Sequence, residues 1–323
     1  MVASLAEQLS IDEIGPGEYA SRIPPERMGN ALPIAYGGCT LGIAVHAACK
    51  TVPPTHRLYS LVGHFLGPAS TTEKLYCTVH SSRNTKTFAT RRVEVSQIRP
   101  DGKKRVCLEL LADFQIEEPA MLTYSTPPVL QYSGPEKSRS FGELAREAVA
   151  SGQMDEKDAA KVIESFALGD SFFDTRLCPE GVSGQNVGGA NKQKQTTQEH
   201  LPITDKTSGD WSRTRAPLES RDERAAAVAF LLDGGLAFLP LGHSHKWLDD
   251  SAACSSLDFA LRLFSSDIDL SSWHLRERRT TAGGLGRTYT EARLWDEKGH
   301  LVASMTQQSI MRPWPENKTK GKL

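Results

Sequence analysis

The chain has 323 residues, enough for one large domain or two modest ones with separate cores. With 38 Lys and Arg against 39 Asp and Glu, its formal net charge of -1 gives no support to a nucleic-acid or anionic-membrane partner. No apolar run approaches the roughly 20 residues that span a bilayer, and the acidic N-terminal sequence lacks the apolar core of a secretion signal, so we expect neither a membrane span nor secretion.

Residues 37–52 predict a buried helix, because their apolar side chains recur at helical spacing and two prolines follow directly. The RPDG sequence at 99–102 is typical of a hairpin turn. Four strand-like runs, rich in Val, Leu, Thr and aromatic residues, span 58–66, 74–82, 87–98 and 104–115. One helix followed by such a run predicts an α+β unit in which an antiparallel sheet wraps around the helix.

The second half repeats this order. Ser220, with Glu223 three residues later, predicts a capping box at the start of an Ala-rich helix. The similar segments SLVGHFL and SLDFALR begin at Ser60 and Ser256, 196 positions apart. Strand-like runs span 255–264, 273–279, 286–295 and 300–311. An internal duplication of one helix-plus-sheet module explains this pattern.

We divide the chain into an N-terminal module at 1–120, a helical linker at 121–167, a C-terminal module at 168–315 and a tail at 316–323. Within the C-terminal module, residues 182–209 carry few large apolar side chains and many Gln, Thr, Gly and Lys. Such a segment cannot bury enough surface to offset its ordering entropy, so we expect a flexible insertion. A lid over a substrate is a second, less common interpretation.

Six cysteines are scattered without a CxxC pair or a Cys/His cluster: Cys39, Cys49, Cys77, Cys107, Cys178 and Cys254. In a long chain from a reducing compartment, such residues usually serve as small buried hydrophobes. We therefore expect no disulfide, no metal site and no cofactor.

Several separated segments occur in one characteristic order along nearly the whole chain. In the first half they are YGGCTLGIAVHAACKTVP, LYSLVGHFLGP and TKTFATRRVEVSQ; in the second they are AAAVAFLLDGGLAFLPL, SSLDFALRLF and GHLVASMTQQSIMR. These segments resemble the acyl-CoA thioesterase II family, the double-hotdog thioesterases of bacteria and of eukaryotic peroxisomes. The resemblance implies two fused hotdog modules, each an antiparallel sheet wrapped around a central helix, and hydrolysis of an acyl-CoA to free acid and CoA.

The resemblance also carries over three catalytic residues. Asp233 ends the second predicted helix in an A-x-L-x-D context, Ser256 begins the family's [ST]-[IL]-D strand start, and Gln307 follows V-A-S-x-x. A poorly solvated carboxylate can act as general base toward water, while a hydroxyl and an amide can hold that water and the carboxylate. The sequence shows no GxSxG motif and no evident Ser–His pair, so we expect attack by water and no acyl-serine.

Each of these residues also has a structural interpretation. Asp233 could merely end a helix, and Ser256 could cap a turn. Gln307 lies in an apolar strand, where a buried amide needs partners. Alternation along the strand predicts that Asp258 shares the face of Ser256, as structural support for the site.

Candidate substrate-binding residues come from the first module. Gly37 and Gly38 could let a thioester or phosphate approach backbone N–H groups at a helix start, or could only permit tight packing. Arg91, with Lys86 and Arg92 nearby, is a candidate contact for the CoA phosphates, although arginines on strands are more often solvated.

Departures from the family pattern border this site. Val62 and Phe259 stand where the family commonly has histidine, and Ser309 replaces a glycine. We interpret these changes as favouring a specialised acyl thioester, such as a polyketide-type one, over an ordinary straight-chain fatty acyl-CoA.

Two alternative functions stay open. One is an inactive hotdog protein that binds acyl thioesters or acts as a scaffold, and the other is a hotdog hydratase or dehydratase. The latter would need an Asp and a His together on one module, and no such pair stands beside Asp233 in the sequence. By resemblance we also expect a homo-oligomer, either a dimer or a tetramer. The final residues Gly321, Lys322 and Leu323 are a variant of the S-K-L peroxisomal signal, so we expect a peroxisomal or a cytoplasmic protein.

Overall fold

The computed structural model describes residues 3–29 and 32–315. Within these ranges the strands are β1 (Ile11–Gly15), β2 (Glu18–Ser21), β3 (His56–Phe65), β4 (Tyr76–Asn84), β5 (Phe88–Ile98), β6 (Lys104–Ile116), β7 (Phe173–Leu177), β8 (Ser208–Thr214), β9 (Ala253–Leu263), β10 (His274–Gly284), β11 (Arg287–Trp295) and β12 (Leu301–Arg312). The helices are α1 (Leu5–Gln8), α2 (Gly37–Lys50), α3 (Phe141–Ala150), α4 (Glu156–Phe172), α5 (Val182–Asn186), α6 (Arg221–Asp233) and α7 (Leu239–His243). The predicted tail at 316–323 lies outside the described residues.

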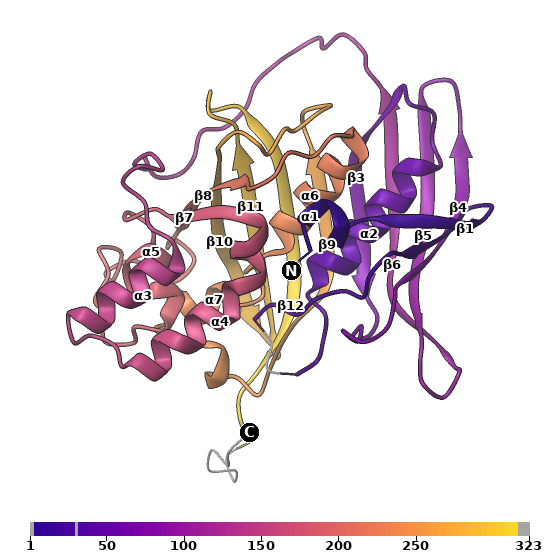
Figure 1. Cartoon of the computed structure of the whole chain (residues 1–323). Coiled ribbons are helices and arrows are strands. Elements are labelled where there is room, and N and C mark those ends of the chain that lie inside the picture. The colour runs from indigo at the N-terminus through magenta and orange to yellow at the C-terminus, as the bar shows by residue number, and fades with distance from the viewer. Residues whose placement is uncertain (1–2, 30–31, 316–323) are drawn as a thin grey trace.

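The strands form one antiparallel sheet in the order β1-β2-β4-β5-β6-β3-β9-β12-β11-β10-β8-β7 (Figure 1). The first half of the chain supplies one half of the sheet and the second half supplies the other. They join where β3 pairs with β9, with Leu61 opposite Leu261. The predicted α+β architecture of two fused hotdog modules is confirmed, and the two sheets form one continuous surface.

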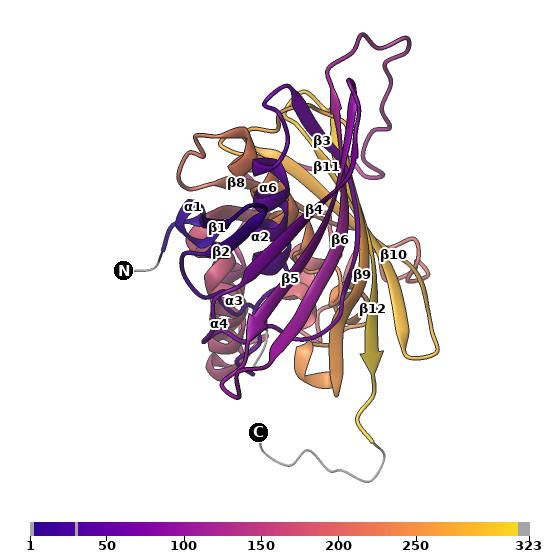
Figure 2. The ribbon, with the colours of Figure 1, turned by 90° about the vertical axis from the view of Figure 1, so that its right-hand side faces the viewer.

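Helices α2 and α6 lie next to each other on the same side of the curved sheet (Figure 2). Almost every residue of α2 is buried, as expected of a helix that is apolar all round. A β-carbon at Gly42 would lie 3.1 Å from the carbonyl oxygen of Ala226, so the glycine lets the two helices approach closely. The predicted capping box of Ser220 and Glu223 begins α6. The two predicted central helices therefore share one core.

The RPDG sequence forms the expected turn between β5 and β6. The Gly102 N–H donates to the carbonyl oxygen of Arg99 at 2.8 Å, and Gly102 has a φ of +76°. A positive φ is cheap only for glycine, which explains its place at the end of this turn.

A long connection leads from β6 to α3 and arches over the edge of the molecule (Figure 1). Its far end is held by Glu277, whose carboxylate accepts hydrogen bonds from the N–H of Val129 and the hydroxyl of Tyr132, the latter at 2.8 Å. The polar helices expected in the linker are α3 and α4, and α4 continues to Phe172. No helix within the described residues is long and apolar enough to cross a membrane.

The segment 182–209, expected to be a flexible insertion, is instead packed onto the second module. It contains α5 and the start of β8, and Asn186 in it is completely buried. The Gln198 side chain accepts from the N–H of Thr207 at 2.7 Å and donates to the carbonyl oxygen of Glu180 at 2.9 Å. Polar side chains here fix the backbone through hydrogen bonds, a contribution that a count of apolar residues does not register.

Candidate active site

The structure brings Asp233 and Gln307 into direct contact, although they are far apart in the sequence. Asp233 is the last residue of α6, and Gln307 lies on the inner face of β12. The Gln307 amide Nε2 donates to Oδ1 of Asp233 at 2.7 Å. Both side chains are buried, so the carboxylate meets an amide donor in a place with little solvent.

The start of α2 completes the surroundings of this carboxylate. The backbone N–H of Gly38 donates a hydrogen bond to Asp233. A β-carbon at Gly37 would lie only 2.8 Å from Oδ2 of Asp233. The glycine pair therefore allows the end of α6 to approach the beginning of α2, with the carboxylate between them.

Burial raises the pKa of Asp233 to about 7, although the hydrogen bonds from Gln307 and Gly38 act in the opposite direction. Desolvation disfavours the charged carboxylate more than these two donors favour it. A carboxyl group with a pKa near neutrality can take up and return a proton at ordinary pH.

Ser256 lies on the strand next to Gln307 and faces the same side of the sheet. Its Cα partner on β12 is Ser309, which is two residues beyond Gln307. Paired residues of an antiparallel ladder project to the same face, as do residues two apart on one strand. Among the described residues, no hydrogen bond joins the Ser256 hydroxyl to Asp233 or to another side chain, so this hydroxyl is available to a ligand.

Asp258 does not share this face, contrary to the expectation from strand alternation. A bulge shifts the register, so that Asp258 pairs with Gln308 while Ser256 pairs with Ser309. Because Gln308 and Ser309 are consecutive, their partners project to opposite faces of the sheet. Asp258 therefore lies on the outer face and is not support for the site.

Ser309 contributes to the site in a way that sequence reasoning missed. Its side chain is fully buried, and its hydroxyl donates to Oε1 of Gln307 at 3.4 Å. With Oε1 accepting from Ser309, the other end of the amide is directed at Asp233. The signal available in the sequence was the departure from glycine at this position.

Family models for the N-terminal and C-terminal domains of acyl-CoA thioesterases match residues 24–115 and 173–311. The chain belongs to the acyl-CoA thioesterase family. It is therefore a hydrolase of acyl-CoA thioesters.

Solved structures with the same fold support this assignment of architecture. An acyl-CoA thioesterase II from Mycobacterium marinum is 20% identical, with a TM-score of 0.69 over 97% of this chain and 100% of that one. A tesB protein from Mycobacterium avium subspecies paratuberculosis is 15% identical, with a TM-score of 0.68 over 96% and 98%. A hot dog fold protein of unknown function from Alicyclobacillus acidocaldarius is 14% identical, with a TM-score of 0.68, also over 96% and 98%.

Arg91, a candidate for binding CoA phosphates, is turned away from solvent in this thioesterase. It is buried, and its guanidinium donates to the hydroxyl and the carbonyl oxygen of Thr51, both at 2.9 Å. Thr51 is the C-cap of α2, so Arg91 satisfies the end of that helix. We therefore leave Arg91 out of the proposed substrate site.

The other departures from the family pattern lie on opposite faces. Phe259 is buried on the inner face, as the Cα partner of both Gln307 and Gly63, and its ring centroid lies 5.4 Å from that of Phe65. Val62 is 37% exposed. Only Phe259 therefore narrows the space beside the amide of Gln307.

The duplicated modules of the thioesterase do not carry duplicated chemistry. Where α6 ends in Asp233, α2 ends in Lys50, and the residue 197 positions before Gln307 is Leu110. Lys50 pairs with Asp222 at 3.0 Å. A cavity of about 450 Å³ lies there, between the end of α2 and the beginning of α6, and not at Asp233. The end of α2 therefore holds neither the buried carboxylate nor the amide found at the end of α6.

Proposed function

We propose that this thioesterase hydrolyses its acyl-CoA substrate with a water molecule that Asp233 activates as general base. The buried contact between Asp233 and Gln307 carries the proposal, because it pairs a carboxylate of raised pKa with a donor that fixes its direction. Ser256 supports the same assignment through its place on the adjacent strand and its unoccupied hydroxyl.

In the proposed reaction, the Asp233 carboxylate takes a proton from water while the water oxygen attacks the carbonyl carbon of the thioester. The tetrahedral intermediate then collapses, and the bond between carbon and sulfur breaks. Protonated Asp233 returns its proton to the departing sulfur, so that CoA leaves as a thiol and the acyl group as a free acid. Gln307 holds the carboxylate, and the Ser256 hydroxyl is placed to bind the water or the carbonyl oxygen.

We further propose that the acyl group enters a cavity of about 320 Å³ between α7 and the inner face of β10, β11 and β12. Thr288 lines this cavity and is the Cα partner of Ser309. Ser309 is two residues from Gln307 on the same face, so Thr288 connects the lining of this cavity to the strand that carries Gln307. Much of the remaining lining is apolar, for example Pro240, Leu241, Ala282 and Met311.

Thr288 also supports a specialised acyl substrate. It is only 8% exposed, and its hydroxyl has no hydrogen-bond partner among the described residues. A buried hydroxyl without a partner is costly, and a polar group on the acyl chain would satisfy it. We therefore expect Thr288→Val to reduce kcat/KM for hydroxyacyl- or oxoacyl-CoA more than for a plain acyl-CoA of equal length. An equal reduction for both would contradict this substrate class.

A panel of acyl-CoAs with a thiol reagent that detects free CoA tests the main proposal. We expect turnover by the wild type and a loss of about 100-fold or more in Asp233→Asn. Asp258→Asn is the matched control, because this acid stands two residues from Ser256 in the sequence but lies on the outer face of the sheet. Binding of acyl-CoA without turnover would support the scaffold alternative instead.

Two further expectations stay predictions. A homo-oligomer can be tested by light scattering after size exclusion; the exposed neighbours Val62 and Leu111 on the outer face are the first residues to substitute.

Peroxisomal import can be tested by fusing a fluorescent protein to the last twelve residues of this sequence. Diffuse fluorescence would contradict peroxisomal import.

A further inference from the structure

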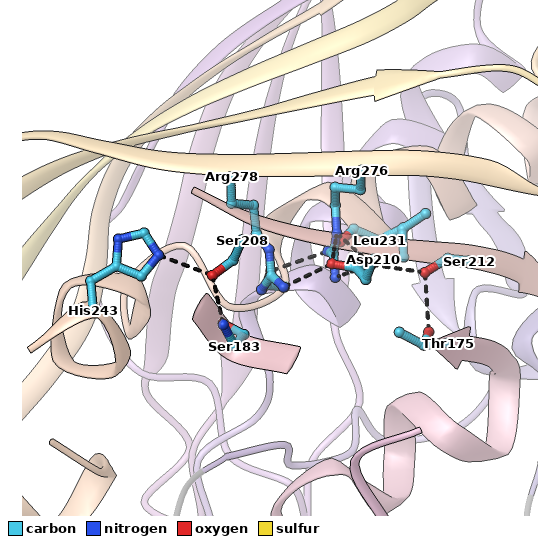
Figure 3. A network of polar contacts seen from close by, with 10 residues as sticks. Thr175, Ser183, Ser208, Asp210, Ser212, Leu231, His243, Arg276 and Arg278 are labelled. Atoms are coloured by element: carbon cyan, nitrogen blue, oxygen red, sulfur yellow. Dashed lines mark hydrogen bonds and ion pairs between the residues drawn. The ribbon is translucent and has the colours of Figure 1, made fainter. Parts of the chain in front are cut away.

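A buried network of charged side chains and hydroxyls lies beside the end of α6 (Figure 3). At its centre is Asp210 on β8, the fully buried Cα partner of Arg276 on β10. Its Oδ1 lies 3.1 Å from Nη2 of Arg276, and its Oδ2 lies 2.7 Å from Nη2 of Arg278. The Ser212 hydroxyl also donates to Oδ1, at 3.1 Å. Buried charges are costly unless they are paired, and here each arginine is paired with Asp210.

Arg276 connects this network to the backbone on both sides of Asp233. Its Nη1 donates to the carbonyl oxygen of Leu231 at 2.5 Å and to that of Gly234 at 3.1 Å. Gly234, the C-cap of α6, has φ of -66° and ψ of 117°, and the left-handed residue that commonly closes a helix follows at Gly235, whose φ is +82°. The guanidinium satisfies the carbonyl groups of Leu231 and Gly234 at this helix end, and its charge suits the negative end of the helix.

Titratable groups from the start of α2 face Asp233. They are Tyr36, the N-cap of this helix, and Cys39 in its first turn. Arg276 and Arg278 from β10 lie near Tyr36, and both guanidinium groups pair with Asp210. The contributions to the pKa of Asp233 itself are burial and the hydrogen bonds from Gln307 and Gly38.

We propose that Arg276, held in place by Asp210 and Ser212, is a positioning residue for Asp233. The inference rests on the proposed function, in which Asp233 is the general base. By fixing the carbonyl groups of Leu231 and Gly234, the guanidinium fixes the direction in which the carboxylate leaves the helix end toward Gln307. Arg276 itself touches no reacting atom, and its charge is paired with Asp210.

The test compares Arg276→Lys with Arg278→Lys. Both variants keep a buried positive charge next to Asp210, but only Arg276 donates to the two carbonyl oxygens at the helix end. We expect Arg276→Lys to lower kcat about tenfold or more while KM stays within about threefold of the wild type, because small misplacements of a catalytic group are costly. The midpoint of its kcat–pH profile should move to higher pH, since the Gln307 hydrogen bond that lowers the pKa of Asp233 is weakened. Arg278→Lys should keep the wild-type midpoint.

Three results would overturn the inference. They are a wild-type kcat in folded Arg276→Lys, an unshifted pH midpoint, or the same loss and shift in Arg278→Lys. If Arg276→Lys does not fold, Ser212→Ala tests the same chain of contacts with a smaller loss of stability. Ser212 and Arg276 share one oxygen of Asp210. It should show the same shift with a loss of kcat of about two- to fivefold, and an unchanged profile would contradict the inference.

Failure of the proposed function would give a different pattern. In that case the wild type would release no CoA from any acyl-CoA tested, or Asp233→Asn would remain fully active. If the wild type is active and depends on Asp233, but Arg276→Lys has the wild-type kcat and pH midpoint, the positioning role of Arg276 is excluded. The proposed role of Asp233 would then still stand.

Discussion

Gly37 and Asp233 approach so closely that a single added carbon would collide with the proposed base. A β-carbon on Gly37 would stand 2.8 Å from Oδ2 of the carboxylate. The contact joins the first residue of the N-terminal module's central helix to the last residue of the C-terminal module's helix. The site therefore depends on how the two modules are docked, and not on either module alone.

Gly37→Ala should displace the Asp233 carboxylate and lower kcat by about tenfold or more. Gly284→Ala is a matched control, because a β-carbon there meets no atom within 4 Å. Steady-state kinetics on both variants, with circular dichroism to confirm folding, would check the prediction. Equal activity of the two variants would contradict it.

The kcat of the enzyme should rise with pH through a midpoint near the Asp233 pKa of about 7, because a general base must be deprotonated. The Gln307 hydrogen bond lowers that pKa. Gln307→Leu should therefore move the midpoint to higher pH and also reduce the plateau. Gln308→Leu, on the outer face of the same strand, is the control, and a shared shift in both variants would argue against a specific role for Gln307.

Asp233 should also make the folded protein less stable as the pH rises. Between about pH 4 and pH 7, the folded state retains a proton that the unfolded carboxyl has already released, so the free energy of unfolding falls with increasing pH. About three pKa units at roughly 1.4 kcal/mol each set an upper limit of about 4 kcal/mol for this loss. Urea denaturation should show Asp233→Asn gaining stability over the wild type from pH 5 to pH 8. A difference that does not change with pH would exclude this explanation.

Ser309→Ala should lower kcat about two- to tenfold, the range expected for losing one modest hydrogen bond. The hydroxyl donates to Oε1 of Gln307, and without it the amide is less firmly directed at Asp233. Ser304→Ala removes a hydroxyl from the opposite face of the same strand and should leave kcat unchanged. If Ser309→Ala also behaves like the wild type, the orientation of Gln307 is set by Asp233 alone.

Much of the architecture could be predicted from local patterns. Apolar residues at helical spacing predicted α2, alternating strand-like runs predicted β3 to β6 and β9 to β12, and the RPDG sequence predicted the turn at Gly102. Short edge strands such as β1 and β7 were missed, since a few residues of weak pattern do not stand out from loops. The family resemblance named Asp233 and Gln307, and the structure places these two side chains in contact.

The errors share a physical cause. Asp258 was assigned to the wrong face because a bulge broke the alternation that the prediction assumed. Arg91 was a candidate contact for the CoA phosphates, whereas it satisfies the end of α2 at Thr51. In both cases the outcome depended on a neighbouring strand or helix, which a pattern within one segment does not contain.

By itself, the sequence determined the duplicated modules, the family and the residue types of the proposed catalytic site, because periodicity and motif order are properties of the chain. Only the tertiary structure decided which helix ends meet, which face each strand residue takes, and that Arg276 and Asp210 hold the end of α6. These depend on register, on bulges and on contacts between distant segments. Burial in that arrangement also sets the pKa of Asp233, since the carboxylate loses its solvent only when both modules close around it.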